Sequence, residues 1–173
     1  LLTLNDDVRV VLIKLADRLH NCRTIEFMPE HKRDKILSET MFVFIPLAHR
    51  LGLYNVKSEM EDIWLRFKEP EAFNEISAKI NRNITDKDKQ INEFIAPIED
   101  ALNRSGFKFE IKKRVKTPYS IWNKMNTKGI SFDQIYDLYA VRIIFDPDKN
   151  SHETERDQCY HGFSIITGLY RYK

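Results

Sequence analysis

The sequence predicts an α+β fold in which an all-α N-terminal part precedes a partial α/β part. Up to Gly106, apolar residues recur at the spacing of amphipathic helices. After Gly106 the period changes to two, because three apolar residues alternate with charged ones: Phe107, Phe109 and Ile111. Residues 138–145 (LYAVRIIF) are then almost all apolar, which is typical of a central strand covered on both faces. These changes of period indicate two different layers of structure in one chain.

The first part of the chain is expected to be entirely helical. Its expected helices cover residues 7–27, 30–51, 56–68 and 71–80. Pro46 should kink or divide the second helix, and Gly52 is a natural residue just past its end. The first helix carries an apolar stripe that can face a core, formed by Val8, Leu12, Leu15, Leu19 and Cys22.

The second part is expected to mix helices with strands. A helix with Thr85 as its N-cap ends at Gly106 and leads into the first strand. A helix over residues 119–127 follows, and Gly129 stops it. After the second strand, residues 158–172 are expected as a helix with an inward side of Tyr160, Phe163, Ile166, Leu169 and Tyr170. The shift from all-α to α/β sequence places a domain boundary near residues 70–85, and we divide the chain into residues 1–69 and 70–173.

The composition is that of a globular protein without a membrane segment. The chain has 173 residues, of which 42% are hydrophobic and 31% charged, and this is not a disordered composition. No apolar run approaches the roughly 20 residues that span a bilayer, and no signal-peptide pattern opens the chain. The two cysteines lack metal-ligand spacing, so a reducing, cytoplasmic setting is expected. The missing initiator methionine suggests an excised fragment.

The charge is concentrated in one segment. The net charge of the whole chain is only +2, whereas the segment from Arg104 to Lys128 has eight lysines or arginines and one acid, Glu110. A local basic cluster on a nearly neutral protein favours a small polyanion site, such as one for nucleotide phosphates. A nucleic-acid-binding stripe and an ordinary solvated face are the two alternatives.

The stretch KLADRLHNCRT, residues 14–24, places three polar side chains on one side of the first helix. Asp17, Asn21 and Thr24 are separated by four and three residues, so they share a face that differs from the apolar stripe. Asp17 with nearby His20 could bind a divalent metal ion. One acid on one helix is not a complete metal site, so plain surface decoration is the alternative.

A second polar set lies where a strand leads into a helix. Arg114 and Lys116 share one face at the end of the strand, and Ser120 and Lys124 are one helical turn apart. A helix N-terminus favours an anion, because it has free backbone N–H groups and the positive end of the helix dipole. No GxxxxGK[ST] motif occurs, so any phosphate site here would depend on side chains.

The third candidate lies at the beginning of the apolar run. Asp137 comes just before it, where an acid is well placed for Mg²⁺ and for activating a hydroxyl group. Arg142 lies within the run, and an arginine in such a place is usually paired or stacked on a planar group. The alternative is a structural ion pair between these two residues.

With these segments in view, the sequence resembles the RelA/SpoT family of alarmone enzymes, and most of all its bifunctional Rel type. VRVVLIKLADRLHNCRT resembles a hallmark segment of the family's HD-type hydrolase domain. RVKTPYSIWNKM and FDQIYDLYAVRIIF resemble the opening of its nucleotidyltransferase-like synthetase domain, and QCYHGFSIITGLYRYK resembles the helix that follows. The matches cover nearly all of the chain in the family's order. The resemblance thus implies the end of a hydrolase domain joined to the start of a synthetase domain.

For the hydrolase half, the resemblance implies one wall of a metal-dependent site. Asp17 would be a ligand of Mn²⁺, and Asn21 and Thr24 would contact the guanosine nucleotide. The implied reaction is hydrolysis of (p)ppGpp to GDP or GTP and pyrophosphate. The parent would then be a (p)ppGpp 3′-pyrophosphohydrolase as well as a GTP pyrophosphokinase of the stringent response.

For the synthetase half, the resemblance implies an ATP site. Arg114 and Arg142 would sandwich the adenine ring. The phosphates of ATP would be held by Lys116, Ser120 and Lys124. Asp137 would bind Mg²⁺ and help to activate the 3′-hydroxyl of GDP or GTP for attack on the β-phosphate. Physical reasoning asks for similar groups: a cationic phosphate site, planar stacking and an acid beside a metal ion.

The chain also departs from the family pattern. Cys22 replaces a usual methionine and Lys113 replaces a frequent glycine, but neither is an implied ligand. The upstream His and His-Asp metal ligands, the guanine-stacking tyrosine and the second Mg²⁺-binding acid are missing, so half of each site is expected here and the fragment itself is expected to be inactive. Ribosome or tRNA contacts would come only from regions outside this chain, and no membrane partner is expected.

Two other functions remain open from the sequence. A nucleic-acid-binding module would need exposed aromatic residues among the lysines, and only Tyr119 and Trp122 are candidates. A degenerate, purely regulatory relative is the other. The complete sets of polar residues argue against such decay.

Overall fold

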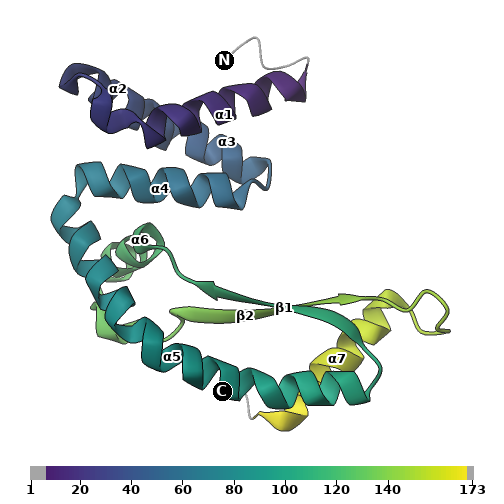
Figure 1. The fold of residues 1–173 in the computed structure, drawn as a ribbon. Coiled ribbons are helices and arrows are strands. Elements are labelled where there is room, and N and C mark those ends of the chain that lie inside the picture. Colours follow the sequence, from purple (N-terminus) through teal and green to yellow (C-terminus); the bar gives the residue numbers. More distant parts are fainter. Residues whose placement is uncertain (1–6, 171–173) are drawn as a thin grey trace. The chain divides into compact units, whose positions relative to one another are not determined.

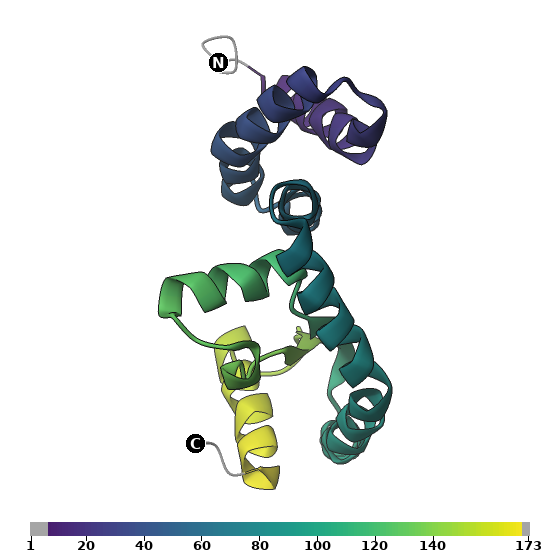
Figure 2. The ribbon, with the colours of Figure 1, turned by 90° about the vertical axis from the view of Figure 1, so that its left-hand side faces the viewer.

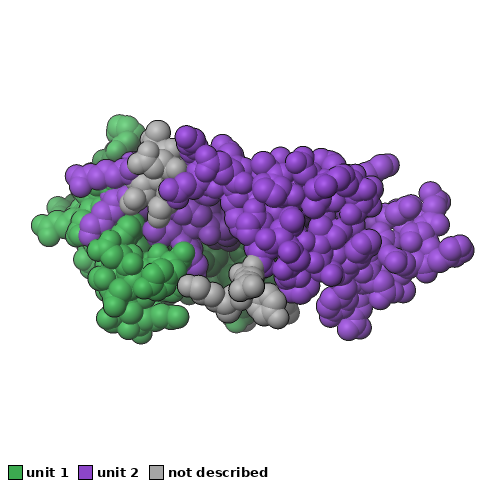
Figure 3. Space-filling view, turned by 90° about the horizontal axis from the view of Figure 1, so that it is seen from below, with its two compact units in different colours: residues 1–78, 117–136 green, residues 79–116, 137–173 purple. Residues whose placement is uncertain are grey.

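The structure, a computed structural model, describes residues 7–170, without the side chains of residues 83–87. The chain divides into two compact units (Figure 3). Unit 1 holds Leu1–Ala78 together with Thr117–Tyr136, and unit 2 holds Lys79–Lys116 together with Asp137–Lys173. Unit 1 is helical, and unit 2 combines helices with a small sheet (Figure 1). The predicted α+β class is confirmed.

Unit 1 is built around a helical bundle whose members follow one another along the chain. Its helices are α1 (Val8–Arg23), the 3₁₀ turn η2 (Ile25–Phe27), α2 (Glu30–Glu39), the π turn η3 (Thr40–Phe44), α3 (Ile45–Arg50) and α4 (Tyr54–Lys68). Within residues 7–107 of the described chain there is no strand, as the helical periodicity predicted. No helix of the described residues is long and apolar enough to cross a bilayer.

The core of unit 1 uses a different stripe of α1 from the one predicted. Val11, Leu15 and Cys22 are buried, whereas Val8 and Leu12 are 57% and 42% exposed. Val11 belongs to the same face as Leu15 and Cys22, since it stands four residues before the first and eleven before the second. The prediction was therefore right for Leu15, Leu19 and Cys22 and wrong for Val8 and Leu12.

Pro46 divides the second predicted helix, as expected. The chain passes from α2 through the π turn η3 to α3, and Pro46 lies in the first turn of α3, where its missing N–H costs no helical hydrogen bond. Gly52 follows the end of α3 with a φ of +72°, a conformation that residues with a β-carbon seldom adopt. The predictions from Pro46 and Gly52 are thus both confirmed.

A segment from later in the chain completes unit 1. It holds α6 (Pro118–Lys128) and the 3₁₀ turn η4 (Phe132–Gln134). α6 runs across α4, which is seen end-on in Figure 2, and does not lie alongside it. Trp64 of α4 packs against Tyr119 and Trp122 of α6, with ring centroids 6.1 and 6.0 Å apart. These aromatic contacts place part of the predicted α/β region with the helical unit.

One long helix replaces two predicted ones. α5 (Pro70–Arg104) is continuous in its backbone, although separate helices were expected before and after residue 85. No glycine or proline stands between residues 71 and 96, so nothing in that stretch forces a break. The predicted cap residue Thr85 lies outside the described side chains. The expectation of a helix end near residue 80 was wrong.

Unit 2 is a two-stranded antiparallel sheet with helices on one face. β1 (Lys108–Val115) pairs with β2 (Tyr139–Asp146), and Lys112 is opposite Arg142 in the register. The later turns of α5 and α7 (Glu155–Leu169) lie on the same side of the sheet (Figure 1). The other face of the sheet is exposed. The period-two pattern predicted at the start of β1 is confirmed.

Two predictions about unit 2 were wrong. β2 is not covered on both faces in the described chain, because Ala140, Arg142, Ile144 and Asp146 are exposed. Half-buried and exposed positions alternate along β2, but the sequence does not show this because Ala140 and Ile144 on the exposed side are apolar. In α7, three residues expected to face inward are largely exposed: Tyr160 at 59%, Phe163 at 61% and Leu169 at 41%.

Candidate functional site

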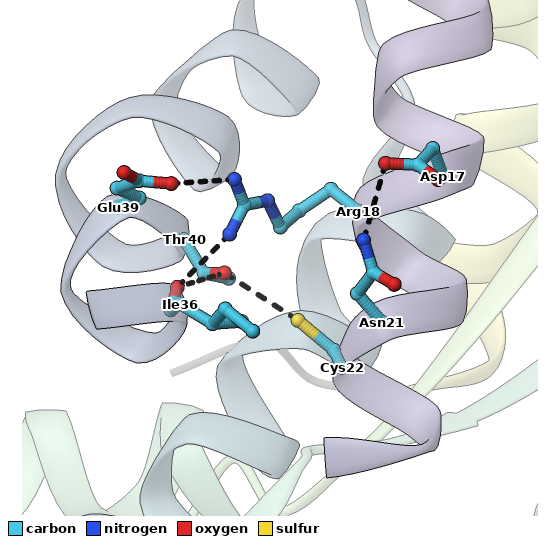
Figure 4. Close-up of polar contacts among 7 residues, drawn as sticks. All are labelled: Asp17, Arg18, Asn21, Cys22, Ile36, Glu39 and Thr40. Carbon is cyan, nitrogen blue, oxygen red and sulfur yellow. Dashed lines mark hydrogen bonds and ion pairs between the residues drawn. The ribbon is translucent and has the colours of Figure 1, made fainter. Parts of the chain in front are cut away.

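The polar face of α1 is formed as the spacing predicted. Asn21 Nδ2 donates a hydrogen bond to Asp17 Oδ2 at 3.1 Å (Figure 4). Thr24 is the C-cap residue of α1, and its hydroxyl donates to the carbonyl oxygen of His20 at 3.0 Å. Asp17 is exposed, so its carboxylate is accessible from solvent. The three side chains therefore form a row on the side of the helix.

The residues behind this row hold α1 in place. Arg18 extends from α1 to α2, where Nη2 lies 2.6 Å from Glu39 Oε2 (Figure 4). Its guanidinium carbon also lies 4.3 Å from the ring centroid of Phe44. Cys22 Sγ lies 3.4 Å from Thr40 Oγ1 in the core. Burial raises the pKa of the Cys22 thiol, which makes it a packing residue and not a reactive thiolate.

A divalent metal ion would find only part of its ligands on α1. The exposed carboxylate of Asp17 is a suitable oxygen ligand. Among residues 7–170, apart from the undescribed side chains, no group of three or more His, Cys, Asp and Glu residues could hold a metal ion. The donor chemistry thus fits one metal ligand, and a complete site would need further ligands beside Asp17.

The exposed face of the sheet in unit 2 carries several of the predicted ATP-binding cations. Lys112 is directly opposite Arg142, and Arg114 is opposite Ala140 two pairs further along, on the same face. Arg114 and Arg142 are therefore diagonal neighbours on one face, close enough for long side chains to reach each other. Like charges at adjacent positions disfavour pairing, and an anion or a planar π system between them would relieve this cost.

Lys116 and Asp137 form an ion pair at the end of the sheet. Lys116 Nζ lies 2.7 Å from Asp137 Oδ2, and Lys116 N donates to the carbonyl oxygen of Leu138 at 2.9 Å. The side chain of Asp137 is 56% exposed. The sequence assigned the two residues to different partners, a phosphate and a metal ion, whereas the structure joins them. An exposed carboxylate beside an ammonium group can still accept a metal ion, because it has two oxygens.

Ser120 and Lys124 belong to α6 and therefore to unit 1, whereas Arg114, Lys116, Asp137 and Arg142 belong to unit 2. α6 begins with Thr117 as its N-cap, whose hydroxyl accepts a hydrogen bond from Ser120 N at 3.3 Å. A left-handed Gly129 ends it, as predicted. The local sequence signals thus predicted this helix accurately. The six residues predicted for the synthetase, however, are divided between the two units.

The N-terminus of α6 holds a carboxylate that the sequence analysis missed. Asp62 Oδ1 of α4 accepts a hydrogen bond from Tyr119 N at 2.9 Å. The pKa of Asp62 is raised to about 6, mainly by burial and to a smaller extent by the charge of Glu61, although hydrogen bonds from Tyr119 and Thr117 act in the opposite direction. Two N–H groups expected to be free for a phosphate are therefore engaged. Sequence alone offers no signal for a contact that spans 57 residues.

The described cavities of unit 2 lie away from the predicted site residues. An open apolar pocket of about 620 Å³ is lined by α5, β2 and α7 on the covered side of the sheet. A polar cavity of about 480 Å³ lies at the other end of the strands, near Lys108 and Asp146. None of the residues predicted to bind ATP lines either cavity.

Comparison with known proteins matches both ends of the chain. Residues 1–54 match a family model described as "HD domain", and residues 113–173 match one described as "Region found in RelA / SpoT proteins". Asp17, Asn21 and Thr24 fall in the first match. The six residues predicted for the synthetase fall in the second: Arg114, Lys116, Ser120, Lys124, Asp137 and Arg142.

Individual relatives resemble the chain along almost its whole length. A GTP pyrophosphokinase of Myxococcus xanthus is 41% identical over 171 residues, which cover 99% of this chain and 22% of that protein. The GTP pyrophosphokinase rsh of Brucella ovis is 35% identical over 96% of this chain and 21% of its own. A guanosine-3′,5′-bis(diphosphate) 3′-pyrophosphohydrolase of Aquifex aeolicus is 35% identical over 96% of this chain and 23% of its own. The chain thus spans about a fifth of the length of these relatives.

Proposed function

The chain belongs to the RelA/SpoT family, as a segment that joins the end of an HD domain to the start of the RelA/SpoT region, and we propose that it is part of a bifunctional alarmone enzyme. The intact enzyme transfers pyrophosphate from ATP to the 3′-hydroxyl of GDP or GTP. It also hydrolyses (p)ppGpp to GDP or GTP and pyrophosphate. Relatives with names for each of the two reactions support both assignments. We place the join between the two functional regions near residue 70.

The synthetase assignment depends above all on the exposed face of the sheet. Arg114 and Arg142 are diagonal neighbours there, and Ala140 is the only side chain opposite Arg114. A small residue beside two guanidinium groups leaves room for a flat ring between them, which is how arginine binds planar groups. This arrangement supports the adenine of ATP as the ligand of these two residues.

The phosphates of ATP are assigned to the cations nearby in the sequence. Lys116 lies two residues after Arg114 at the end of β1, and Ser120 and Lys124 lie on α6. In the reaction the 3′-oxygen bonds to the β-phosphorus, the bond between that phosphorus and the α,β-bridging oxygen breaks, and AMP leaves. Side-chain cations stabilise the charge that develops on the phosphate oxygens in such a transfer.

Asp137 is the proposed acid of the synthetase. Its exposed carboxylate lies beside Lys116, so it can hold a divalent metal ion with one oxygen and keep its pairing with the other. We assign Mg²⁺ to this site, where the ion would neutralise phosphate charge. We assign to the same carboxylate the role of accepting the proton of the attacking 3′-hydroxyl.

The hydrolase assignment depends on the row along α1. Asp17 is an exposed carboxylate that can serve as one metal ligand, and we assign Mn²⁺ to it. Asn21, whose amide is hydrogen-bonded to Asp17, and Thr24 are the proposed contacts of the guanosine nucleotide. The remaining metal ligands lie outside the described residues. We also propose a cytoplasmic location, since the enzyme would act on nucleotide pools there.

The nucleic-acid alternative finds no support in the structure. Tyr119 and Trp122, the two aromatic candidates among the basic residues, pack against each other and against Trp64. They are therefore not available for stacking on bases.

The deciding experiment is to assay the intact protein for ATP-dependent alarmone synthesis and for metal-dependent alarmone hydrolysis. Absence of both activities in correctly folded protein would contradict the proposed function.

A further inference from the structure

A single carboxylate links the start of α6 to α4. Tyr119 is the second residue of α6, and its N–H has no partner within the helix because it belongs to the first turn. Asp62 Oδ1 accepts a hydrogen bond from this N–H at 2.9 Å, and Thr117 accepts one from the N–H of Ser120 at 3.3 Å. The first turn of α6 is thus capped from two sides, once by its own chain and once by α4.

The packing around this link fixes the direction of α6. Trp64 contacts the rings of both Tyr119 and Trp122, and the Tyr119 hydroxyl lies 3.9 Å from Met41 Sδ. Ile121 is completely buried on the same helix. α6 therefore cannot turn about its own axis without breaking these contacts. Ser120 and Lys124 are carried on this fixed helix.

Asp62 has no cation to offset its charge. No ion pair joins it to a lysine or arginine in the described part of the chain, and its neighbour Glu61 is itself paired with Lys57 at 2.6 Å. A half-buried carboxylate without a cation costs free energy. The helix N-terminus reduces this cost in part, since it presents N–H donors and the positive end of the dipole.

We infer that Asp62 is a positioning residue for the synthetase reaction, which fixes the first turn of α6 from α4 and so determines where Ser120 and Lys124 meet the phosphates of ATP. The inference rests on the proposed function for the roles of Ser120 and Lys124. Asp62 itself touches no substrate in this arrangement. It acts through the backbone of Tyr119.

The test compares two variants of Asp62 in the intact enzyme. Asp62→Ala removes the acceptor, and Asp62→Asn keeps an acceptor oxygen but removes the charge. The expected result for Asp62→Ala is a KM for ATP raised about tenfold, the scale of one lost hydrogen bond at a buried donor, with a smaller change in kcat. Asp62→Asn should stay within about threefold of wild type. Hydrogen exchange of the backbone amides in residues 119–124 should become faster in Asp62→Ala only.

Asp34→Ala is the matched control, because Asp34 is a carboxylate of the same unit that pairs with Lys68 at 2.7 Å on the surface. It should leave both the KM for ATP and the exchange of α6 unchanged. A wild-type KM in Asp62→Ala, or unchanged exchange in α6, overturns the inference. A lower KM in Asp62→Ala also overturns it, since the carboxylate would then be blocking the phosphates. If the intact wild-type enzyme makes no alarmone at all, the proposed function fails and this inference falls with it.

Discussion

Lys116 and Asp137 are paired at 2.7 Å although 20 residues separate them, and these are the residues at which the chain leaves unit 2 and returns to it. The segment between them holds α6 and η4 and belongs to unit 1. A backbone hydrogen bond from Lys116 N to Leu138 O also joins the two ends of this segment. The ion pair therefore joins the two ends of the segment that carries Ser120 and Lys124. The two residues that hold these ends together are also residues of the proposed synthetase site.

Asp17→Asn in the intact enzyme should abolish hydrolysis and leave synthesis largely intact. Loss of a metal-binding carboxylate removes several kcal/mol of transition-state stabilisation, so the hydrolysis rate should fall on the order of 10³-fold or more. Both reactions should be assayed, with folding checked by circular dichroism. Asp34→Asn serves as the control. If Asp17→Asn hydrolysed alarmone at the wild-type rate, the polar face of α1 would be ordinary surface.

Asp137→Asn should have the opposite effect. It should lower the rate of synthesis on the order of 10³-fold and spare hydrolysis, because the proposed metal ligand and proton acceptor is lost. The variant also loses its ion pair with Lys116, but a pair this exposed contributes only about 0–1 kcal/mol to folding. The fold should therefore persist. Normal synthesis by a folded Asp137→Asn enzyme would remove Asp137 from the site.

Lys116→Glu should weaken ATP binding in the synthetase. The substitution replaces a phosphate-binding cation with an anion and puts two carboxylates side by side, so the KM for ATP should rise at least about tenfold. Lys116→Arg should recover much of the affinity because it keeps the charge. Lys149→Glu, in the exposed loop after β2, is the control for a general change in charge. Equal losses from Lys116→Glu and Lys149→Glu would indicate only long-range electrostatics.

The isolated chain of residues 1–173 should neither make nor hydrolyse alarmone at a meaningful rate. On the proposed assignments it holds one carboxylate for the hydrolase metal and only part of the synthetase site, and incomplete sets of catalytic groups lose most of their effect. Weak ATP binding through the residues from Arg114 to Arg142 is expected in calorimetry at millimolar ATP. Rapid turnover of either reaction by this chain would show that a complete site is already present.

The pH dependence of stability should reveal Asp62. Its pKa in the folded protein is about 6, raised from 3.8 mainly by burial, so the folded state holds the proton more tightly than the unfolded state. Its contribution to stability is complete below about pH 4 and is lost as the pH rises through 6. The unfolding free energy of wild type relative to Asp62→Asn should thus fall by on the order of 1 kcal/mol between pH 4 and 7.

The two tryptophans make this measurement specific. Trp64 and Trp122 are the only tryptophans of the chain, and they contact each other where α4 meets α6. Their fluorescence during urea unfolding at each pH therefore reports the region around Asp62. A constant difference between wild type and Asp62→Asn from pH 4 to 7 would show that Asp62 keeps an ordinary pKa.

Features governed by neighbours in the sequence were predicted well. Gly129 ends α6 and Pro46 divides the second predicted helix, as their positions in the sequence indicated. The spacing of Asp17, Asn21 and Thr24 was enough to place them in one row. The roles assigned to these residues stay predictions, whereas their placement on a common helix face follows from helical geometry alone.

Features governed by distant contacts were not predicted. The exposure of Tyr160 and Phe163 depends on which elements pack against α7, and the exposed side of β2 depends on how many strands join the sheet. Asp62 was missed for the same reason, since its partner lies on a helix from the other functional region. Periodicity identifies a face that can be buried, but it does not identify what will cover that face.

The contact of α4 with α6 limits how the family's two regions can be exchanged between proteins. A chimaera that joins the first 69 residues of one relative to the second region of another would combine an α4 and an α6 that had not evolved together. Trp64 and Asp62 would then contact residues of a different protein at the positions of Tyr119 and Trp122. A chimaera should therefore fold only when α4 and α6 come from the same parent protein. The segment that can be exchanged is thus longer than the region matched by the synthetase family model.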